Sequence, residues 1–290
     1  MKAVLTLILT IFYLGFTQAK ASTESTPSSV IFEDSTISYQ VYGQGELTLV
    51  FVHGWSCDSH YWQQQIDRFS QDFKVVTVDL AGHGNSVSNR DDYTIDSFAL
   101  DVAAVVNNEN LQQVILVGHS MGATVTVEAA HLLGDKVIGV ISVDALLNVT
   151  LRVQPGAIPA IIAPFKADFS SAAEAFVDTM FLESAEPQLV DWIKRDMSSA
   201  PEKVAINSFE NYLIYYSGDR SIKSFLNFHL PIVSINARQR PTNVDANREA
   251  IGDYEVVFIE DSGHFPMLEK PEAFNELLQS AVEQISANKR

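Results

Sequence analysis

The 290-residue sequence contains a single cysteine, Cys57, and has few basic residues. One cysteine cannot form a disulfide within the chain, and the cysteine and histidine residues lack the spacing of a metal site. Only 19 lysine and arginine residues stand against 36 aspartate and glutamate residues, so the formal net charge is -17 at pH 7. Because phosphate backbones bind clustered positive charge, we expect no nucleic-acid partner. The same charge argues against docking on anionic lipid through basic patches.

Long apolar runs are also absent, with one exception at the N-terminus. Lys2 precedes a largely apolar stretch, residues 3–16, and the small-x-small sequence Ala19-Lys20-Ala21 follows it. This order is typical of a secretory signal peptide, and an apolar stretch of about 14 residues is short for a transmembrane helix. We therefore predict a signal peptide over residues 1–21, cleaved after Ala21, rather than an uncleaved anchor. The mature protein would then be periplasmic or secreted, with no membrane span.

The rest of the chain has the composition of a globular protein with a buried core, with 47% hydrophobic and 19% charged residues. After a polar leader over residues 22–29, short β-branched segments alternate with helical patterns. This alternation predicts an α/β fold with a doubly wound, mostly parallel sheet. The predicted strands are residues 37–42, 47–52, 75–78, 114–117, 137–143, 232–235 and 255–259, and the predicted helices are residues 61–70, 95–107, 121–133 and 271–287.

The alternation stops after Asp144 and resumes at Pro231. Residues 145–230 have helical character without a clear strand, and the interval is too long for a simple connection. We predict that it forms a helical cap subdomain inserted into a core of residues 30–144 and 231–290. Its aromatic side chains are expected mainly to form the core of the insert, because apolar stripes at helical spacing usually do so. A few of them would line an acyl pocket, and the sequence does not identify which.

A strand, the pattern G-x-S-x-G and a helix start follow one another in VILVGHSMGA, residues 114–123. The two glycines, Gly118 and Gly122, permit a sharp strand-to-helix turn around Ser120. Such a turn lifts the serine hydroxyl above the sheet at the positive end of a helix. The bare pattern is common, but the strand before it and the helix after it make Ser120 a candidate nucleophile.

A serine hydroxyl becomes a good nucleophile only when a base takes its proton. The best candidate for this base is His264, which lies just beyond the last predicted strand in EVVFIEDSGHFP. A loop at this position can carry the imidazole over the C-terminal edge of the sheet, and Gly263 allows the loop to bend. The other histidines lie in turns, on a helix or away from strand ends, where simpler explanations apply.

Four motifs, in this order along the chain, resemble those of the α/β-hydrolase superfamily. They are VHGW (residues 52–55), DLAGHGNS (79–86), GHSMG (118–122) and GHFPMLE (263–269), and the resemblance extends from about residue 30 to the C-terminus. It implies a serine esterase-like or lipase-like member with a helical cap, in which Ser120 is the nucleophile and His264 the general base. It also implies an oxyanion hole made by the backbone N–H groups of Trp55 and Met121. No metal or organic cofactor is needed for this chemistry.

The catalytic acid is where the sequence departs from the common pattern of this superfamily. Most members carry the acid after the strand that follows the insert, but PIVSINARQRP, residues 231–241, has no carboxylate there. Asp144 ends the strand after the helix of Ser120, where some members place their acid, and it is the preferred candidate. Asp245 lies beyond Arg240 and would serve only if its loop folds back. A protein without a functional acid is the third alternative.

These observations predict an exported serine hydrolase that cleaves a small or medium carboxylic ester or lactone through an acyl-enzyme on Ser120. The expected partner is a small ester-like substrate, and the oligomeric state is not predicted. An amide or peptide hydrolase of the same fold is one alternative, and a non-catalytic ligand-binding relative is another.

Overall fold

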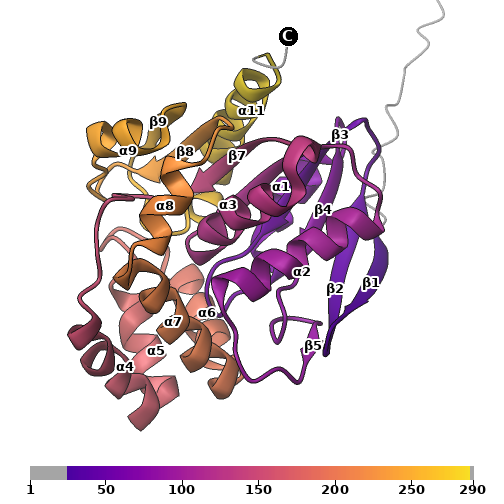
Figure 1. The fold of residues 1–290 in the computed structure, drawn as a ribbon. Helices are drawn as coiled ribbons and strands as arrows, with labels where there is room; N and C mark the ends of the chain where they lie inside the picture. The colour runs from indigo at the N-terminus through magenta and orange to yellow at the C-terminus, as the bar shows by residue number, and fades with distance from the viewer. Residues whose placement is uncertain (1–24, 288–290) are drawn as a thin grey trace, which may run out of the picture.

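The computed structural model describes residues 25–287, which form one sheet flanked by helices (Figure 1). The predicted signal peptide, residues 1–21, lies outside the described residues. The strands are β1 (Thr26–Phe32), β2 (Ser35–Tyr42), β3 (Leu47–Val52), β4 (Lys74–Val78), β5 (Val87–Ser88), β6 (Gln113–His119), β7 (Val137–Val143), β8 (Ile232–Ala237) and β9 (Tyr254–Ile259). They lie in the order β1-β2-β4-β3-β6-β7-β8-β9, and β5 pairs with β2.

The sheet is mixed but mostly parallel. Strand β2 pairs antiparallel with β1, β4 and β5, and all pairs from β4 to β9 along the sheet are parallel. The central strands are apolar and buried along nearly their whole length, because helices cover them on both faces. The α/β fold predicted from the sequence is confirmed, and each predicted strand is present to within two residues at its ends.

Strand β1 begins at Thr26, so residues 26–29 belong to the sheet and not to a polar leader. Its side chains are exposed or half-exposed throughout. A strand at the edge of a sheet needs no apolar run, and for this reason the sequence pattern did not reveal it.

Two groups of helices pack on the sheet. Helix α2 packs against α3, and α3 packs against β6 and β7, whereas α11 packs against β7, β8 and β9 and also contacts α1. Helix α9, which the sequence did not predict, contacts β9. The bounds are α1 (Gln63–Phe69), α2 (Ile95–Asn108), α3 (Met121–Leu133), α9 (Val244–Ile251), α10 (Pro266–Glu269) and α11 (Pro271–Ala287).

The interval 145–230 contains helices and no strand. Figure 1 shows α4 to α7 grouped beside the sheet, at the lower left of the view, and we call these four the cap helices. The last helix of the interval, α8, contacts α3 and α9, so it packs with the helices of the core. The bounds are α4 (Ile158–Ala167), α5 (Phe169–Asp178), α6 (Pro187–Ser198), α7 (Glu202–Ser217) and α8 (Arg220–Leu226).

Candidate active site

Ser120 occupies a strained turn between β6 and α3. Its φ of 53° and ψ of -120° lie in a region that residues with a side chain rarely adopt. The turn needs glycine at both flanking positions, because a side chain would not fit at either of them. A Cβ on Gly118 would lie 2.4 Å from the carbonyl oxygen of Gly122, and a Cβ on Gly122 would lie 2.4 Å from that of His53. The backbone N–H of Ser120 donates to the carbonyl of Val143, which fixes the turn to the end of β7.

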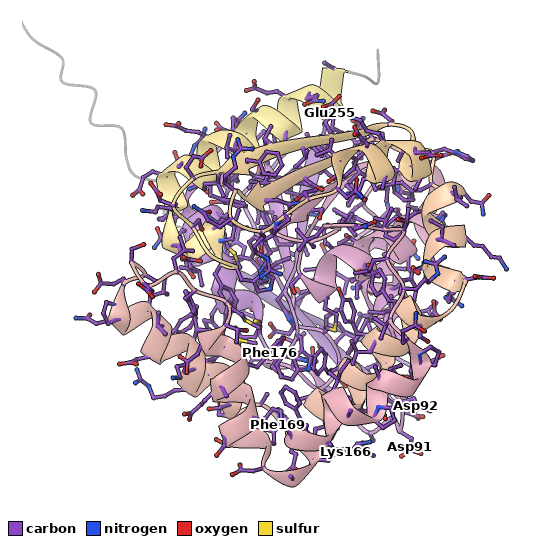
Figure 2. All side chains as sticks on the ribbon, turned by 90° about the vertical axis from the view of Figure 1, so that its left-hand side faces the viewer. Asp91, Asp92, Lys166, Phe169, Phe176 and Glu255 are labelled. Atoms are coloured by element: carbon purple, nitrogen blue, oxygen red, sulfur yellow. The ribbon has the colours of Figure 1, made fainter. Side chains whose placement is uncertain are left out.

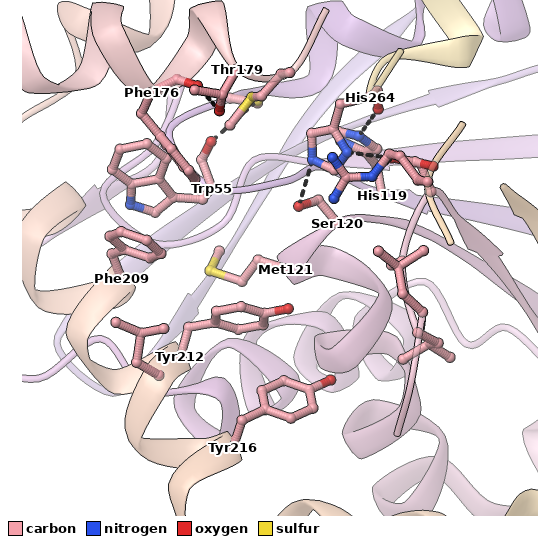
Figure 3. A pocket seen from close by; sticks show the side chains of 18 of the residues that line it. Trp55, His119, Ser120, Met121, Phe176, Thr179, Phe209, Tyr212, Tyr216 and His264 are labelled. Carbon is pink, nitrogen blue, oxygen red and sulfur yellow. Dashed lines mark hydrogen bonds and ion pairs between the residues drawn. The ribbon is translucent and has the colours of Figure 1, made fainter. Parts of the chain in front are cut away.

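The imidazole of His264 lies against the hydroxyl of Ser120, as Figure 3 shows. Its Nε2 is 3.0 Å from Ser120 Oγ, and its Nδ1 is 2.5 Å from Oδ2 of Asp144. A carboxylate can only accept, so Nδ1 carries the proton and Nε2 is free to accept the serine proton. The backbone N–H of His264 donates to the carbonyl of Met180 at 2.8 Å. This hydrogen bond connects the loop of His264 to the segment between α5 and α6.

Asp144 stands at the C-terminal end of β7 and is buried. Its φ is 43°, its backbone N–H donates to the carbonyl of Ile235, and its Oδ1 accepts from the N–H of Ala237 at 2.9 Å. The other oxygen is thereby turned toward His264. Asp245, the alternative acid, lies exposed in the first turn of α9, so the carboxylate that reaches His264 is that of Asp144.

The two backbone N–H groups expected in an oxyanion hole belong to residues that line the same cavity as Ser120. Met121 is the first residue of α3, so its N–H has no partner four residues back within the helix. Within residues 25–287, neither this N–H nor that of Trp55 donates to a protein acceptor. Both donors therefore remain available to a bound molecule.

Buried polar side chains fix the loops around Trp55. The ring of His53 accepts at Nε2 from the N–H of Leu80 at 3.0 Å, and Asp79 accepts from the backbone N–H groups of Ser59 and Asn85, each at 2.9 Å. Burial lowers the pKa of His53, so the ring stays neutral. These contacts give His53 and Asp79 a structural role, because they hold the loops beside the site.

Glu269 holds both neighbours of His264, a contact that sequence reasoning missed. Its carboxylate accepts from the N–H of Gly263 at 2.8 Å and from that of Phe265 at 2.9 Å. Burial raises the pKa of Glu269, and these two hydrogen bonds act in the opposite direction. The sequence contained the signal, since Glu269 closes the motif GHFPMLE, but nothing local showed which groups the carboxylate would bind.

A cavity of about 320 Å³ opens beside Ser120 and His264. Figure 3 shows Trp55, Phe176 and Phe209 gathered on one side of Ser120, and Met121, Tyr212 and Tyr216 below it. The hydroxyl groups of Thr124 and Tyr216 form a hydrogen bond of 2.8 Å, and most of the remaining wall is apolar. Cys57 also lines the cavity, and burial raises the pKa of its thiol well above the usual value.

The side chain of Trp55 extends into an aromatic cluster of the cap helices. Its ring centroid lies 5.1 Å from that of Phe209, 5.7 Å from Phe165 and 5.8 Å from Phe176, and its Nε1 donates to the carbonyl of Ala205 at 2.7 Å. Figure 2 shows Phe176 and Phe169 among the cap helices. The cap helices therefore form part of the cavity wall and also support Trp55, which lines the same cavity.

Arg240 has an unexpected partner. It follows β8, in the segment where most members of the superfamily would carry their acid, and its Nε lies 2.8 Å from Oδ2 of Asp144. The contact is an ion pair without a well-aligned hydrogen bond, because the Nε–H has no acceptor in line with it. The arginine therefore contacts the carboxylate of Asp144, which directly follows β7.

In the described part of the chain, no helix combines the length and the apolar character that crossing a bilayer requires. Among residues 25–287, no group of three or more histidine, cysteine, aspartate or glutamate side chains is arranged to hold a metal ion.

Comparison with known proteins places these motifs in context. A model of the alpha/beta hydrolase family matches residues 49–277. The chain is 31% identical over 154 residues to the pimeloyl-[acyl-carrier protein] methyl ester esterase of Yersinia enterocolitica, an alignment that covers 51% of this chain and 58% of that protein. It is 38% identical over 98 residues to the biotin biosynthesis bifunctional protein BioHC of Cellvibrio japonicus, covering 33% of this chain and 18% of that protein. The alignments thus span little more than half the length of these relatives at most.

The fold is also similar to that of solved structures. A thermophilic esterase from Thermogutta terrifontis superposes with a TM-score of 0.77 at 20% identity, over 90% of this chain and 99% of that one. At this identity the likeness establishes the fold alone.

Proposed function

This chain belongs to the alpha/beta hydrolase family, and from that premise we propose that it is a serine hydrolase that cleaves carboxylic esters through an acyl-enzyme on Ser120. The observation that carries the proposal is the hydrogen-bonded series Ser120–His264–Asp144 beside the cavity. The named esterase activity of the similar Yersinia protein supports the choice of an ester as substrate.

In the first step Ser120 Oγ attacks the ester carbonyl while Nε2 of His264 takes its proton. The imidazolium that forms is stabilised by Asp144, whose Oδ2 already accepts from Nδ1. The fixed hydrogen bond also keeps the ring in the tautomer that can accept the serine proton.

The negative charge that develops on the carbonyl oxygen would be bound by the backbone N–H groups of Trp55 and Met121. Both are held in place before substrate arrives, one by the start of α3 and the other by the cap contacts of its side chain. Donors fixed in advance stabilise the transition state more than the ground state, and loss of one costs roughly 3 kcal/mol of activation free energy.

His264 then passes its proton to the leaving alcohol, and the acyl group remains on Ser120. Water enters, gives a proton to the same imidazole and attacks the acyl carbonyl, which releases the acid and restores Ser120. No step in this sequence needs a group from outside the chain other than substrate and water.

The proposal is tested by covalent labelling of Ser120. A fluorophosphonate should modify the purified protein at one serine, identified by mass spectrometry, and the variant Ser120→Ala should not be labelled. A matched control is Ser142→Ala, since Ser142 is a buried serine of the neighbouring strand. Failure of Ser120 to react, in protein whose unfolding curve shows it to be folded, would contradict the proposal.

A panel of p-nitrophenyl esters from acetate to palmitate then measures the acyl length that the cavity accepts. We expect the highest kcat/KM for small to medium acyl chains, because a cavity of about 320 Å³ with apolar walls cannot enclose a long chain. A parallel p-nitroanilide series separates esters from amides, and we expect esters to be strongly preferred.

Export is a separate part of the proposal, supported by the sequence of residues 1–21 alone. It predicts that the protein recovered from a secreting bacterial host begins at Ser22, after loss of Lys2 and Lys20. The N-terminal sequence of the protein in periplasmic and cytoplasmic fractions tests this, and retention of Met1 in the periplasmic fraction would contradict it.

A further inference from the structure

Arg240 is held beside the reacting groups by its own backbone and by its ion pair. Its N–H donates to the carbonyl of Ala237 at 3.0 Å, so the chain turns tightly after β8. Its Nε lies 2.8 Å from Oδ2 of Asp144, the same oxygen that accepts from His264. Asp144 therefore lies between the guanidinium of Arg240 and the imidazole of His264.

The two Nη groups of Arg240 are free to bind something else. Within residues 25–287 they form no hydrogen bond, and the side chain is 34% exposed although its partner Asp144 is fully buried. A guanidinium has five N–H donors, so the ion pair through Nε leaves most of them unused. Because Arg240 lines the cavity, these donors are available to a molecule bound there.

Arg240 is also the only lysine or arginine among the described residues that line this cavity. In a chain with a net charge of -17, a cation at this place is unusual. Its influence extends across the cavity: burial raises the pKa of Tyr212, and the positive charge of Arg240 acts against that rise. The titratable groups near it are Asp144, whose carboxylate balances its charge, and the imidazoles of His119 and His264.

We propose that Arg240 is a specificity-determining residue, which binds a carboxylate carried by the ester substrate. The inference rests on the proposed ester hydrolysis at Ser120 and names the class of ester that this site prefers. A guanidinium matches a carboxylate with two parallel N–H donors, a geometry that neutral groups do not exploit as well. Since Arg240 lies so near Ser120, short substrates such as monoesters of dicarboxylic acids can reach both groups at once.

The test compares anionic and neutral esters of one size. Monomethyl succinate and monomethyl glutarate carry the carboxylate on the acyl side, with dimethyl succinate and dimethyl glutarate as their neutral counterparts. O-acetyl glycolate carries it on the alcohol side, with O-acetyl glycolamide as its neutral counterpart. We expect the wild-type protein to hydrolyse at least one anionic ester with a kcat/KM on the order of 10- to 100-fold above its neutral counterpart. The anionic series that shows the preference identifies the side of the ester that faces Arg240.

Two variants then assign the preference to the side chain. Arg240→Gln should abolish the ratio of anionic to neutral kcat/KM, mainly through KM, and Arg240→Lys should keep part of it because the charge remains without the planar fork. The ratio is the readout, because any effect of Arg240 on Asp144 changes both substrates equally. Succinate should also protect Ser120 from fluorophosphonate labelling in the wild type and fail to do so in Arg240→Gln.

The outcomes separate this inference from the function on which it rests. If Ser120 is not labelled at all, the proposed function fails. If Ser120 is labelled but the wild type does not distinguish anionic from neutral esters, the function stands and the role of Arg240 in carboxylate binding is overturned. An equal loss for both substrates in Arg240→Gln would also overturn it, since it would show that the arginine acts only through Asp144.

Discussion

At the scale of single residues, the carboxylate of Asp144 is held by three partners. One oxygen accepts from a backbone N–H, and the other faces both His264 and Arg240. The variant Asp144→Asn should lower kcat by roughly three to four orders of magnitude, because the amide favours the wrong tautomer of the imidazole. Hydrolysis of p-nitrophenyl acetate at saturating substrate measures the effect.

Asp245→Asn is the matched control for this change. Asp245 is exposed on α9, so its substitution should leave kcat within a factor of about two, as is usual for surface positions. If Asp245→Asn were the more damaging variant, the acid would have to be reassigned to Asp245 of α9.

The turn at Ser120 requires a residue without a side chain at Gly122. A Cβ at this position would meet the carbonyl oxygens of His53 and Val52 at 2.4 and 2.5 Å, and backbone atoms cannot move aside as a side chain can. We expect Gly122→Ala to lower the free energy of unfolding by about 1–3 kcal/mol and to abolish labelling of Ser120. Gly156→Ala, where a Cβ meets nothing within 4 Å, should change neither. Urea unfolding and fluorophosphonate labelling measure the two effects.

At the scale of elements, a partly buried hydrogen bond joins the cap helices to the core, in addition to the aromatic contacts. Tyr61, just before α1, donates its hydroxyl to Asp196 of α6 at 2.8 Å. Burial raises the pKa of Asp196, and the hydrogen bond from Tyr61 acts against that rise. Loss of the hydroxyl would leave a half-buried carboxylate without this donor.

A double-mutant cycle with Tyr61→Phe and Asp196→Asn measures this contact. Each single variant should be less stable by about 1–2 kcal/mol, and the double variant should lose less than the sum of the two. Urea unfolding gives the coupling energy, and limited proteolysis should cleave the cap helices faster in the single variants. Additive losses would show that the hydroxyl and the carboxylate do not stabilise each other.

Elements with strong local patterns could be predicted from the sequence, and those defined by their neighbours could not. Strands β3 and β7 and helices α3 and α11 were predicted with their observed bounds, because apolar periodicity and helix-start signals lie within each segment. Strand β1 and helix α9 are half-exposed and polar, so their existence depends on the sheet edge and on the packing of their neighbours.

The site divides in the same way. Ser120 and His264 carry their own motifs, whereas the choice between Asp144 and Asp245 depends on which strands are adjacent. Strand β7 pairs with β8, so Asp144, which follows β7, lies close to Arg240, which follows β8. Asp144 also contacts His264. Such contacts join residues far apart along the chain, so no local pattern reports them. For the same reason the sequence did not show which aromatic residues line the cavity. Phe176 and Phe209 line it and also pack on Trp55, whereas Phe165 packs on Trp55 without lining the cavity.

At the scale of the whole molecule, a lower pH changes the free energy of unfolding through the buried histidines and through the net charge. Burial lowers the pKa values of His53, His83 and His119, so all three stay neutral in the folded protein. Acid also reduces the self-repulsion of a chain with a net charge of -17, which favours the folded state. Asp101 acts in the same direction, because burial raises its pKa to about 6 in the folded protein. A plain stability curve against pH therefore mixes opposing effects, and a single histidine is resolved only by comparing variants.

His83 is the best residue for this comparison, since burial lowers its pKa to about 3 in the folded protein. In the unfolded chain its pKa is near 6.5, so between pH 6.5 and pH 3 the unfolded state binds the extra proton and stability falls as the pH falls. The full contribution of His83 over that window is on the order of 5 kcal/mol. Replacing His83 by Asn removes the titration, so the loss of stability from pH 7.5 to pH 5 should be smaller in His83→Asn than in the wild type. The control substitution is His229→Asn, at an exposed histidine whose ring makes no hydrogen bond or ion pair within residues 25–287, and it should leave the slope of the wild type unchanged. Urea unfolding at a series of pH values measures the three curves, and parallel curves for His83→Asn and the wild type would show that His83 takes up no extra proton on unfolding.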